Sequence, residues 1–302
     1  MPKQTFQQLQ TELQGYIGDD SPVTTDILKR ILNDAQREVT LADDWWFRAD
    51  DDSFNTKAPY TTGTISATKG SATLTITGGS FAGLAGYKFA LSVSSPYYRI
   101  ISVASNGLSA TLGREYVETT NAAITSFLIY KDEYELPDVD SITAIKIIKA
   151  GYPELQYISQ SDIDNYDSVP NEQGVPRFYY IAGSNDASAS AQNLHIGLFP
   201  IPDDIYGVSY RFLVGSTDMS APTDLPSLPE SHLPAMKSLA LYRAYTYDYQ
   251  NTPEASQVYQ EYSRQIEDLR RQTKATTVSA FQFKAAGHTR RYIPTIRHQW
   301  PA

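Results

Sequence analysis

The chain has 302 residues, of which 41% are hydrophobic and 20% charged, as is typical of a globular protein that buries a stable core. It contains no cysteine, which excludes disulfides, thiolate nucleophiles and cysteine-ligated metals. The N-terminus is polar and no run of about 18 apolar residues occurs, so we expect neither a signal peptide nor a membrane span.

The charge is distributed unevenly along the chain. The formal net charge is −9, yet residues 270–302 hold seven basic residues and no acidic one. The rest of the chain therefore has 18 basic against 34 acidic side chains, a net charge of −16. A general nucleic-acid-binding protein usually presents a basic face, so this acidic body argues against that class. The 22 tyrosines suit either half-wet interfaces or a β-rich fold, and the two interpretations are compatible.

Two helices are predicted within residues 1–58. The first begins at Thr5, with Gln8 as its capping-box partner, and Gly15 is expected to end it. The second begins at Thr24 or Thr25, and its apolar residues recur at helical spacing as far as Val39.

A bulky aromatic cluster, Trp45, Trp46 and Phe47, follows the second helix. Such a cluster either packs in the core at a domain corner or contacts a partner. Both interpretations stay open, and all three residues are candidates for structural or interface aromatics.

The hydrophobic pattern changes from helical spacing to strict alternation at Pro59. Short alternating runs separated by glycine-containing turns predict an antiparallel β barrel or sandwich over residues 59–135. Within it, the glycine-rich stretch 78–86 is expected to be a hairpin loop, because it lacks the lysine and the following helix of a phosphate loop. A second β-rich region is predicted over 136–225, with strands at 142–148, 178–181, 194–198 and 208–214.

Helices return over residues 226–273. The last of them is capped by Thr252, has Pro253 at its first position and is expected to run to Gln272. Helical segments at both ends of a β-rich middle predict an α+β protein. We expect one four-helix bundle formed by the N- and C-terminal helices, with antiparallel β domains inserted into it and an extended C-terminal arm.

Residues 274–302 show no regular period and are predicted to form that arm, with a reach on the order of 95 Å at about 3.4 Å per residue. A frayed terminus is the alternative, although disordered segments are usually poor in aromatic residues. The aromatic, aliphatic and basic residues of the arm that we expect to bind a partner are Phe281, Phe283, Lys284, Arg290, Arg291, Tyr292, Ile296, Arg297 and Trp300.

No pattern that would carry catalysis is found. The four histidines, His195, His232, His288 and His298, have no metal-ligand spacing, and no Gly-x-Ser-x-Gly nucleophile turn occurs. The stretch 162–167 lacks the glycine and glutamate of a calcium loop, and the acidic runs 50–52 and 203–204 are expected to be solvated turns. We therefore predict no catalytic residue, no metal site and no cofactor, in a protein that is not an enzyme.

A series of short motifs occurs in a fixed order between Ile27 and Leu269. They are the helix Ile27–Val39 with the sequence Ala-Asp-Asp-Trp-Trp-Phe-Arg48 after it, Gly63–Gly78, Tyr98–Val103, Leu112–Tyr116, Tyr134–Pro137, Gly174–Ile181, Leu198–Pro202 and Asp224–His232. In this order they resemble the head-to-tail adaptor proteins of tailed bacteriophages, which are also described as connector, head-completion or neck proteins.

The resemblance implies a structural protein of the virion neck or tail that is made in the host cytoplasm. Adaptors of this family form a ring, typically twelve-fold, beneath the portal. The implied partners are therefore the portal protein, a tail or nozzle protein and further copies of the chain. Viral DNA would pass through the lumen without sequence-specific contact, no membrane is involved, and the C-terminal arm would bind the portal.

Three other classes of protein remain as alternatives. A tail-associated receptor- or carbohydrate-binding β module would use the tyrosines and both β regions, although the helices at the two ends argue against it. A glycan-degrading enzyme would need two carboxylates at a fixed separation. A DNA-binding protein that uses the basic residues between 270 and 297 would lose affinity steeply with salt.

Overall fold

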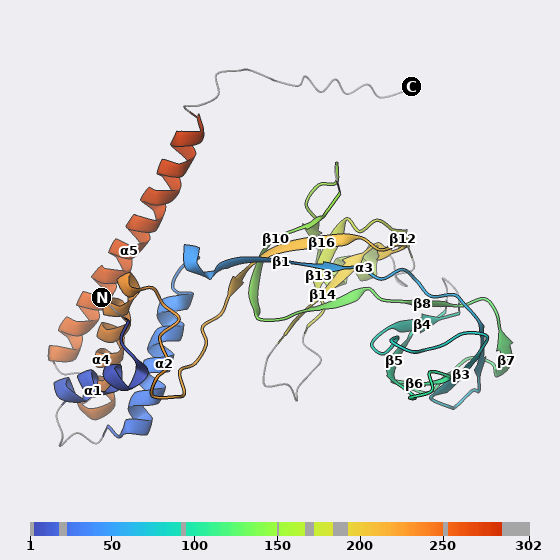
Figure 1. The fold of residues 1–302 in the computed structure, drawn as a ribbon, viewed down its shortest axis with the longest axis horizontal. Coiled ribbons are helices and arrows are strands. Elements are labelled where there is room, and N and C mark those ends of the chain that lie inside the picture. The colour runs from blue at the N-terminus through green and yellow to red at the C-terminus, as the bar shows by residue number, and fades with distance from the viewer. Residues whose placement is uncertain are drawn as a thin grey trace. The chain divides into compact units, whose positions relative to one another are not determined.

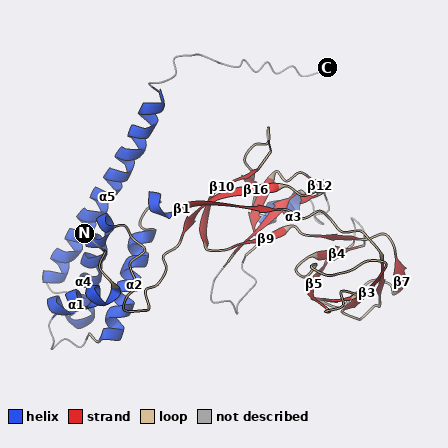
Figure 2. Cartoon of the chain, viewed as in Figure 1, coloured by secondary structure: helices blue, strands red, loops and turns tan. Residues whose placement is uncertain are grey.

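The computed structural model describes residues 3–17, 23–91, 95–149, 151–166, 172–183, 193–249 and 253–285, with only the backbone described at 164–166, 248–249 and 274–285. The chain divides into two compact units. One comprises Met1–Arg48 together with Gly215–Ala302 and is called here the helical unit, and the other, Ala49–Val214, is called the β unit. Among the described residues, all strands lie in the β unit. The short helix α3 also belongs to the β unit, and the other described α-helices belong to the helical unit (Figures 1 and 2).

In the described part of the helical unit there are four α-helices: α1 (Phe6–Ile17), α2 (Thr25–Leu41), α4 (Leu233–Tyr249) and α5 (Pro253–Ala285). The predicted capping box is confirmed, because Thr5 N–H donates to Gln8 Oε1 and Gln8 N–H donates to Thr5 Oγ1. Helix α1 passes through Gly15 to Ile17, so glycine does not end it there. Thr24 caps α2 by accepting a hydrogen bond from the N–H of Ile27.

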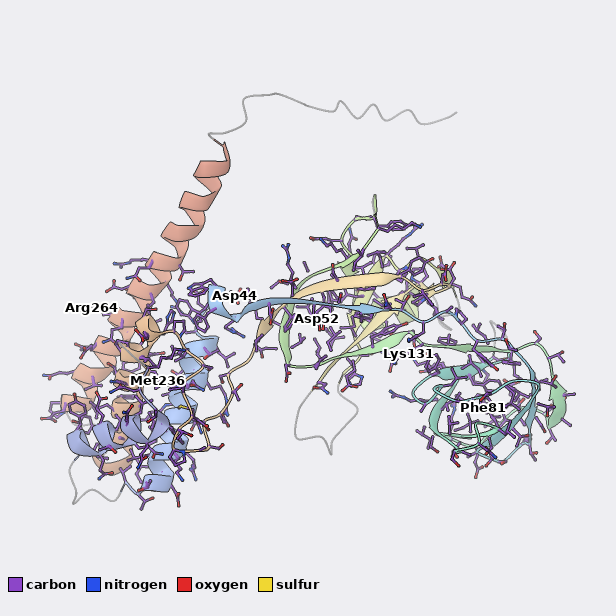
Figure 3. The ribbon with its side chains drawn as sticks, in the orientation of Figure 1. Asp44, Asp52, Phe81, Lys131, Met236 and Arg264 are labelled. Carbon is purple, nitrogen blue, oxygen red and sulfur yellow. The ribbon has the colours of Figure 1, made fainter. Side chains whose placement is uncertain are left out.

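Helix α4 lies among the other three helices and contacts α1, α2 and α5 (Figure 1). A helix surrounded in this way needs apolar or small residues around its whole circumference. Met236, Leu239, Ala240 and Ala244 are all buried, and Met236 points into the interior (Figure 3). The sequence prediction of helices at both ends of an α+β chain is confirmed, with one shared core in the helical unit.

Helix α5 is longer than the sequence predicts. It has 33 residues and continues through 274–285, where an extended arm is expected. The reason is local, since no glycine or proline interrupts the chain between Pro253 and Gly287. The prediction of an extended chain is therefore wrong for residues 274–285, and residues 286–302 lie outside the described part.

The first part of the β unit is one curled, antiparallel seven-stranded sheet with the order β7-β2-β3-β6-β5-β4-β8. Strict alternation in β3 buries Leu74 and Ile76 on the inner side, where Phe81 also lies (Figure 3). The curled single sheet agrees with the barrel alternative better than with a two-sheet sandwich. Its strands are β2 (Thr64–Ala67), β3 (Thr73–Thr77), β4 (Lys88–Ala90), β5 (Tyr98–Val103), β6 (Ser109–Leu112), β7 (Asn121–Ile124) and β8 (Leu128–Tyr130).

The rest of the β unit contains a three-stranded sheet, β1-β16-β10, a four-stranded sheet, β11-β13-β14-β9, and the pair β12-β15. All four predicted strands of this region are present. Two short pairings, β11 with β13 and β12 with β15, are parallel and depart from the predicted antiparallel pattern. The elements are β1 (Ala49–Asn55), β9 (Glu133–Leu136), β10 (Val139–Ile147), β11 (Gln156–Tyr157), α3 (Gln160–Tyr166), β12 (Gln173–Gly174), β13 (Phe178–Ile181), β14 (Leu194–Phe199), β15 (Ile201–Pro202) and β16 (Gly207–Val214).

The acidic run 50–52 forms part of strand β1 rather than the expected turn. Asp50 and Asp52 accept hydrogen bonds from the backbone N–H groups of Asp51 and Ser53, at 2.9 and 2.7 Å. These N–H groups are therefore satisfied at the edge of the sheet, because among the described strands β1 pairs with β16 alone. Charged side chains of this kind protect an edge strand from pairing with other chains. The second acidic run, 203–204, lies in a bend as predicted.

Gly197 gives a direct test of packing in the β unit. A Cβ atom at this position would lie 1.9 Å from Cζ of the buried Tyr180 ring. We predict that Gly197→Ala lowers the free energy of unfolding by about 1–3 kcal/mol, because the ring must move. Urea unfolding measures the change. Gly174→Ala is the matched control, since nothing lies within 4 Å of its Cβ position, and equal stability losses in the two variants would contradict the prediction.

Candidate interaction surfaces of the helical unit

The aromatic cluster after α2 is divided between the core and the surface. Trp45 is fully buried and donates its indole N–H to the carbonyl of Val39 at 2.7 Å. Trp46, in a short 3-10 turn formed by Trp46–Arg48, is 67% exposed. Phe47 lies between them, with its ring centroid 6.4 Å from that of Trp45 and 6.0 Å from that of Trp46. The core interpretation thus fits Trp45, and Trp46 has the exposure that a partner contact needs.

The chain after α2 is fixed by Arg48, which is buried. Its guanidinium donates to the carbonyl of Thr40 at 3.2 Å and to that of Asp43 at 3.4 Å. A cation at this place also suits the negative end of the α2 dipole. Arg48 therefore holds the turn that carries Trp46 at the surface.

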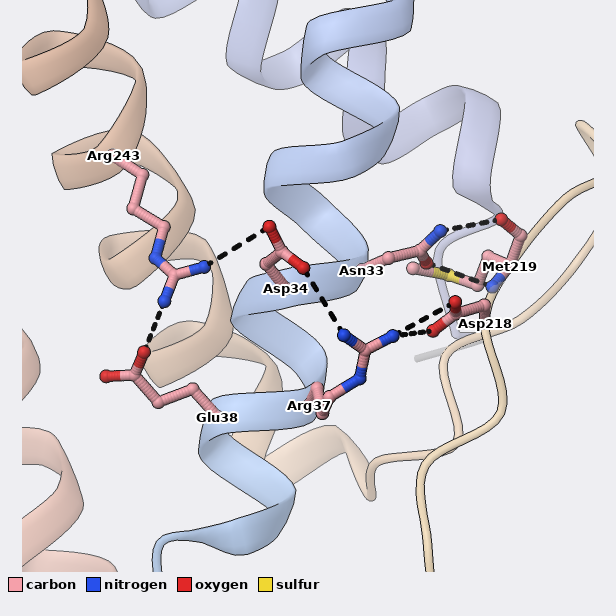
Figure 4. A network of polar contacts seen from close by, with 7 residues as sticks. All are labelled: Asn33, Asp34, Arg37, Glu38, Asp218, Met219 and Arg243. Carbon is pink, nitrogen blue, oxygen red and sulfur yellow. Dashed lines mark hydrogen bonds and ion pairs between the residues drawn. The ribbon is translucent and has the colours of Figure 1, made fainter. Parts of the chain in front are cut away.

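Polar side chains of α2 bind the segment by which the chain re-enters the helical unit after residue 214 (Figure 4). The side-chain amide of Asn33 donates a hydrogen bond to the carbonyl of Met219 at 3.0 Å and accepts one from the N–H of Met219 at 2.9 Å. The fully buried Gln36 donates to the carbonyl of Thr217 at 2.7 Å and accepts from the N–H of Ser227 at 3.1 Å. Buried polar groups need such partners, so these two amides specify the position of the returning chain.

Ion pairs continue this network toward α4 (Figure 4). Arg37 contacts Asp218 at 3.0 Å and Asp34 at 3.5 Å, and Arg243 of α4 contacts both Asp34 and Glu38. These side chains are partly exposed, so each pair contributes little stability by itself. A shallow groove between α2, α4 and α5 is lined by four of them, Asp34, Arg37, Glu38 and Arg243, together with Leu41, Ala42, Tyr262 and Arg270.

A second groove lies between α1, α4 and α5. Leu9, Leu13 and Tyr16, of which Tyr16 is 61% exposed, are among its lining residues. Glu12 and Lys237, paired at 2.7 Å, line it as well. The helical unit therefore offers a groove on either side of α4, and apolar side chains accompany ion pairs in both.

The partner-binding residues predicted in the arm are not brought together by the described structure. Phe281, Phe283 and Lys284 belong to the part of α5 for which the structure describes only the backbone. The other six, Arg290, Arg291, Tyr292, Ile296, Arg297 and Trp300, lie outside the described residues. Their role stays a prediction.

Within the described residues, no three His, Asp or Glu side chains gather as a metal ion would require. The stretch compared with a calcium loop begins in helix α3. Nor does any described helix combine the length and apolarity needed to cross a membrane. Of the histidines, His195 lies on β14, His232 is buried in the helical unit, and His288 and His298 lie outside the described residues.

The sequence matches the family described as SU10 adaptor protein over residues 4–282. This match covers nearly the whole chain, so the chain belongs to that family of phage structural adaptors, which is not a known enzyme family. The resemblance to phage adaptors noted in the sequence is thereby confirmed, and the protein is a structural component of a bacteriophage virion. No curated protein matches the chain.

The sequence pattern does not identify Asn33, Gln36 and Arg243, which organise the helical unit. The only available signal was the position of Gln36 in the apolar stripe of α2, beside Leu32, Ala35 and Val39. A polar residue in such a stripe indicates a buried partner, but its identity depends on a segment 181 residues away in the sequence.

His232 predicts a pH dependence of stability. Burial lowers the pKa of this imidazole, whose ring packs in T-shaped arrangements with the rings of Trp45 and Phe47. The folded state therefore binds fewer protons than the unfolded state below the unfolded pKa of about 6.5, and stability is lost as the pH falls through that value. The loss attributable to this group is at most about 1.4 kcal/mol per pH unit.

The measurement compares urea unfolding of wild type and His232→Gln at pH 7.5 and 5.5. The variant should lose less stability on acidification than the wild type. An identical loss in both proteins would show that His232 does not contribute.

Proposed function

We propose that the protein is the adaptor that joins the capsid portal to the tail, as a ring of copies through which viral DNA passes. The observation that carries the proposal is the family match over residues 4–282, which places this chain among phage adaptor proteins. Its proposed partners are a portal protein above and a tail or nozzle protein below, because an adaptor that joins the portal to the tail must contact both. A twelve-fold ring is the expected assembly.

The helical unit supports the role of a docking body. Helices α1, α2, α4 and α5 share one core, and we propose that they act as the four-helix bundle of the ring. A ring requires two different complementary faces on each copy. The grooves between α2, α4 and α5 and between α1, α4 and α5 are two such faces, and exposed Trp46 is of the residue type that dominates interface energies.

The C-terminal part supports attachment to the portal. Helix α5 spans about 50 Å at about 1.5 Å per residue, and among its described side chains, at 253–273, Ala255, Tyr262, Ile266 and Leu269 are buried. Beyond them the sequence is basic and aromatic, a composition suited to anchoring on an acidic surface. We propose that this part, with Phe281, Arg291 and Trp300 among its contacts, binds the portal.

The charge of the β unit supports a conduit. Between Ala49 and Val214 the sequence has 18 acidic and 10 basic residues, a net charge of −8. Like charge keeps DNA from adhering to a wall that it must pass. The proposal therefore predicts that the residues facing the lumen are acidic, and a basic lumen would contradict it.

The test of portal attachment is the native mass of the chain alone and mixed with the portal protein of its phage. We predict equal stoichiometry in the mixed complex. Deletion of residues 286–302 should weaken binding at least tenfold, and deletion after Lys274 should weaken it further, because it also removes the end of α5. Binding that is unchanged in both deletions would exclude the C-terminal part as the anchor. Trimers that retain glycans and never bind portal would favour the receptor-binding alternative.

Trp45 and Trp46 give a matched pair for testing the surface. Trp46→Ala should leave the midpoint of thermal unfolding unchanged and weaken assembly with the portal or with further copies by about 2 kcal/mol or more. Trp45→Ala should lower the free energy of unfolding by about 3–5 kcal/mol, because it opens a cavity. Calorimetry and binding titration measure both quantities. Normal assembly of Trp46→Ala would show that this side chain is not at an interface.

A further inference from the structure

A buried cluster of three charged side chains lies in the β unit, apart from the surfaces discussed above. Lys88 Nζ, on β4, lies 2.8 Å from Oδ2 of Asp132 and 2.7 Å from Oε1 of Glu133. The exposed fractions of the three side chains are 10%, 5% and 16%. One amine thus contacts two carboxylates in a place that water hardly reaches.

Tyrosine side chains lie near this cluster. Lys88 Nζ lies 4.9 Å from the centre of the Tyr97 ring, and Lys88 is the register partner of buried Tyr130 across β4 and β8. Burial, and after it the charge of Asp132, raises the pKa values of Tyr130 and Tyr180. Both phenols therefore stay neutral near this carboxylate, and the surroundings have a low dielectric constant.

The two carboxylates have different surroundings. Asp132 is buried, and burial raises the pKa of its carboxyl against the attraction of Lys88. Glu133 has a second cation nearby, since Arg99 Nη2 lies 3.5 Å from its Oε2. Burial favours the neutral acid at Asp132, and Arg99 adds a second positive charge beside Glu133. Two carboxyl groups in such different surroundings suit an electrophile and a base.

We propose that Lys88 and Asp132 become joined by an isopeptide bond, formed spontaneously in the folded chain with Glu133 as the base. The fold holds the amine and the carboxyl group in contact, and such fixed proximity replaces the activation that the same reaction needs in water. Exclusion of water also opposes hydrolysis of the product.

The proton transfers balance without an external reactant. Glu133 takes one proton from the Lys88 ammonium and passes it to Asp132, so that a neutral amine meets a neutral carboxylic acid. Burial by itself would lower the pKa of Lys88, but the two carboxylates raise it. The proton transfer neutralises the positive charge of Lys88 and the negative charge of Asp132 together. The amine nitrogen then attacks Cγ of Asp132 and forms the N–C bond.

The C–O bond breaks in the second half of the reaction. Glu133 carries a second proton from the nitrogen to the departing hydroxyl group, which leaves as water. One ammonium and one carboxylate thereby become one amide and one water molecule, and Glu133 is regenerated. The bond would join β4 to the residue preceding β9 and close residues 88–132 into a covalent loop that includes β5, β6, β7 and β8. Tension on the chain would then bypass these strands.

The experiment is intact-mass spectrometry of the full chain after denaturation. The wild-type mass should be lower than the sequence mass by one water molecule. Tryptic digestion should give a branched peptide that contains Lys88 and Asp132, with no cleavage after Lys88. A wild-type chain at full sequence mass after prolonged incubation, with cleavage after Lys88, would show an ion pair only and overturn the proposal. This first measurement needs no variant and no partner protein, so its outcome is independent of the proposed adaptor role.

Two variants then test the role of Glu133. Glu133→Gln preserves the size of the side chain and removes the base, so its mass should equal the sequence mass. Glu135→Gln, on the same strand but exposed, is the matched control and should keep the bond. Lys88→Arg should also remain unlinked. A linked Glu133→Gln chain, or an unlinked Glu135→Gln chain, would contradict the assignment of the base.

Discussion

The pairing of β1 with β16 is the constraint on which the two-unit organisation depends. The chain leaves the helical unit after Arg48 and enters β1 at once. It returns to the helical unit directly after β16, which ends at Val214. Their antiparallel register, Ala49 opposite Leu213, brings both connections to one end of one sheet. An insertion of 166 residues can then be accommodated, because its two ends are held together by a backbone ladder.

Within the helical unit the returning segment is placed by polar side chains rather than by apolar packing alone. Asn33 and Gln36 bond to backbone groups of Met219, Thr217 and Ser227, so a shift of this segment would leave buried donors and acceptors unpaired. Apolar contacts tolerate small displacements, whereas these bonds do not. The returning segment is thereby fixed relative to α2.

The β unit uses charge in two different ways. At the edge of the three-stranded sheet, Asp50 and Asp52 are exposed and satisfy the N–H groups of an edge strand. Around Lys88 the charges are buried and in contact. Exposed charge discourages unwanted pairing with other chains, and buried charge positions reactive groups, so the same residue types serve opposite purposes at different depths.

Local chemistry determined much of this protein from the sequence alone. The capping box at Thr5, the alternation in β3 and the proline that begins α5 act over a few residues, and all of them are confirmed. Together with the order of short motifs they indicated an α+β phage adaptor. Tertiary structure decided the features that join distant residues. These are the strand at Asp50–Asp52, the burial of Trp45 beside exposed Trp46, and the meeting of Lys88 with Asp132. Sequence spacing contains no information about which segment lies across a sheet or beside a helix, because that is set by packing of the whole chain.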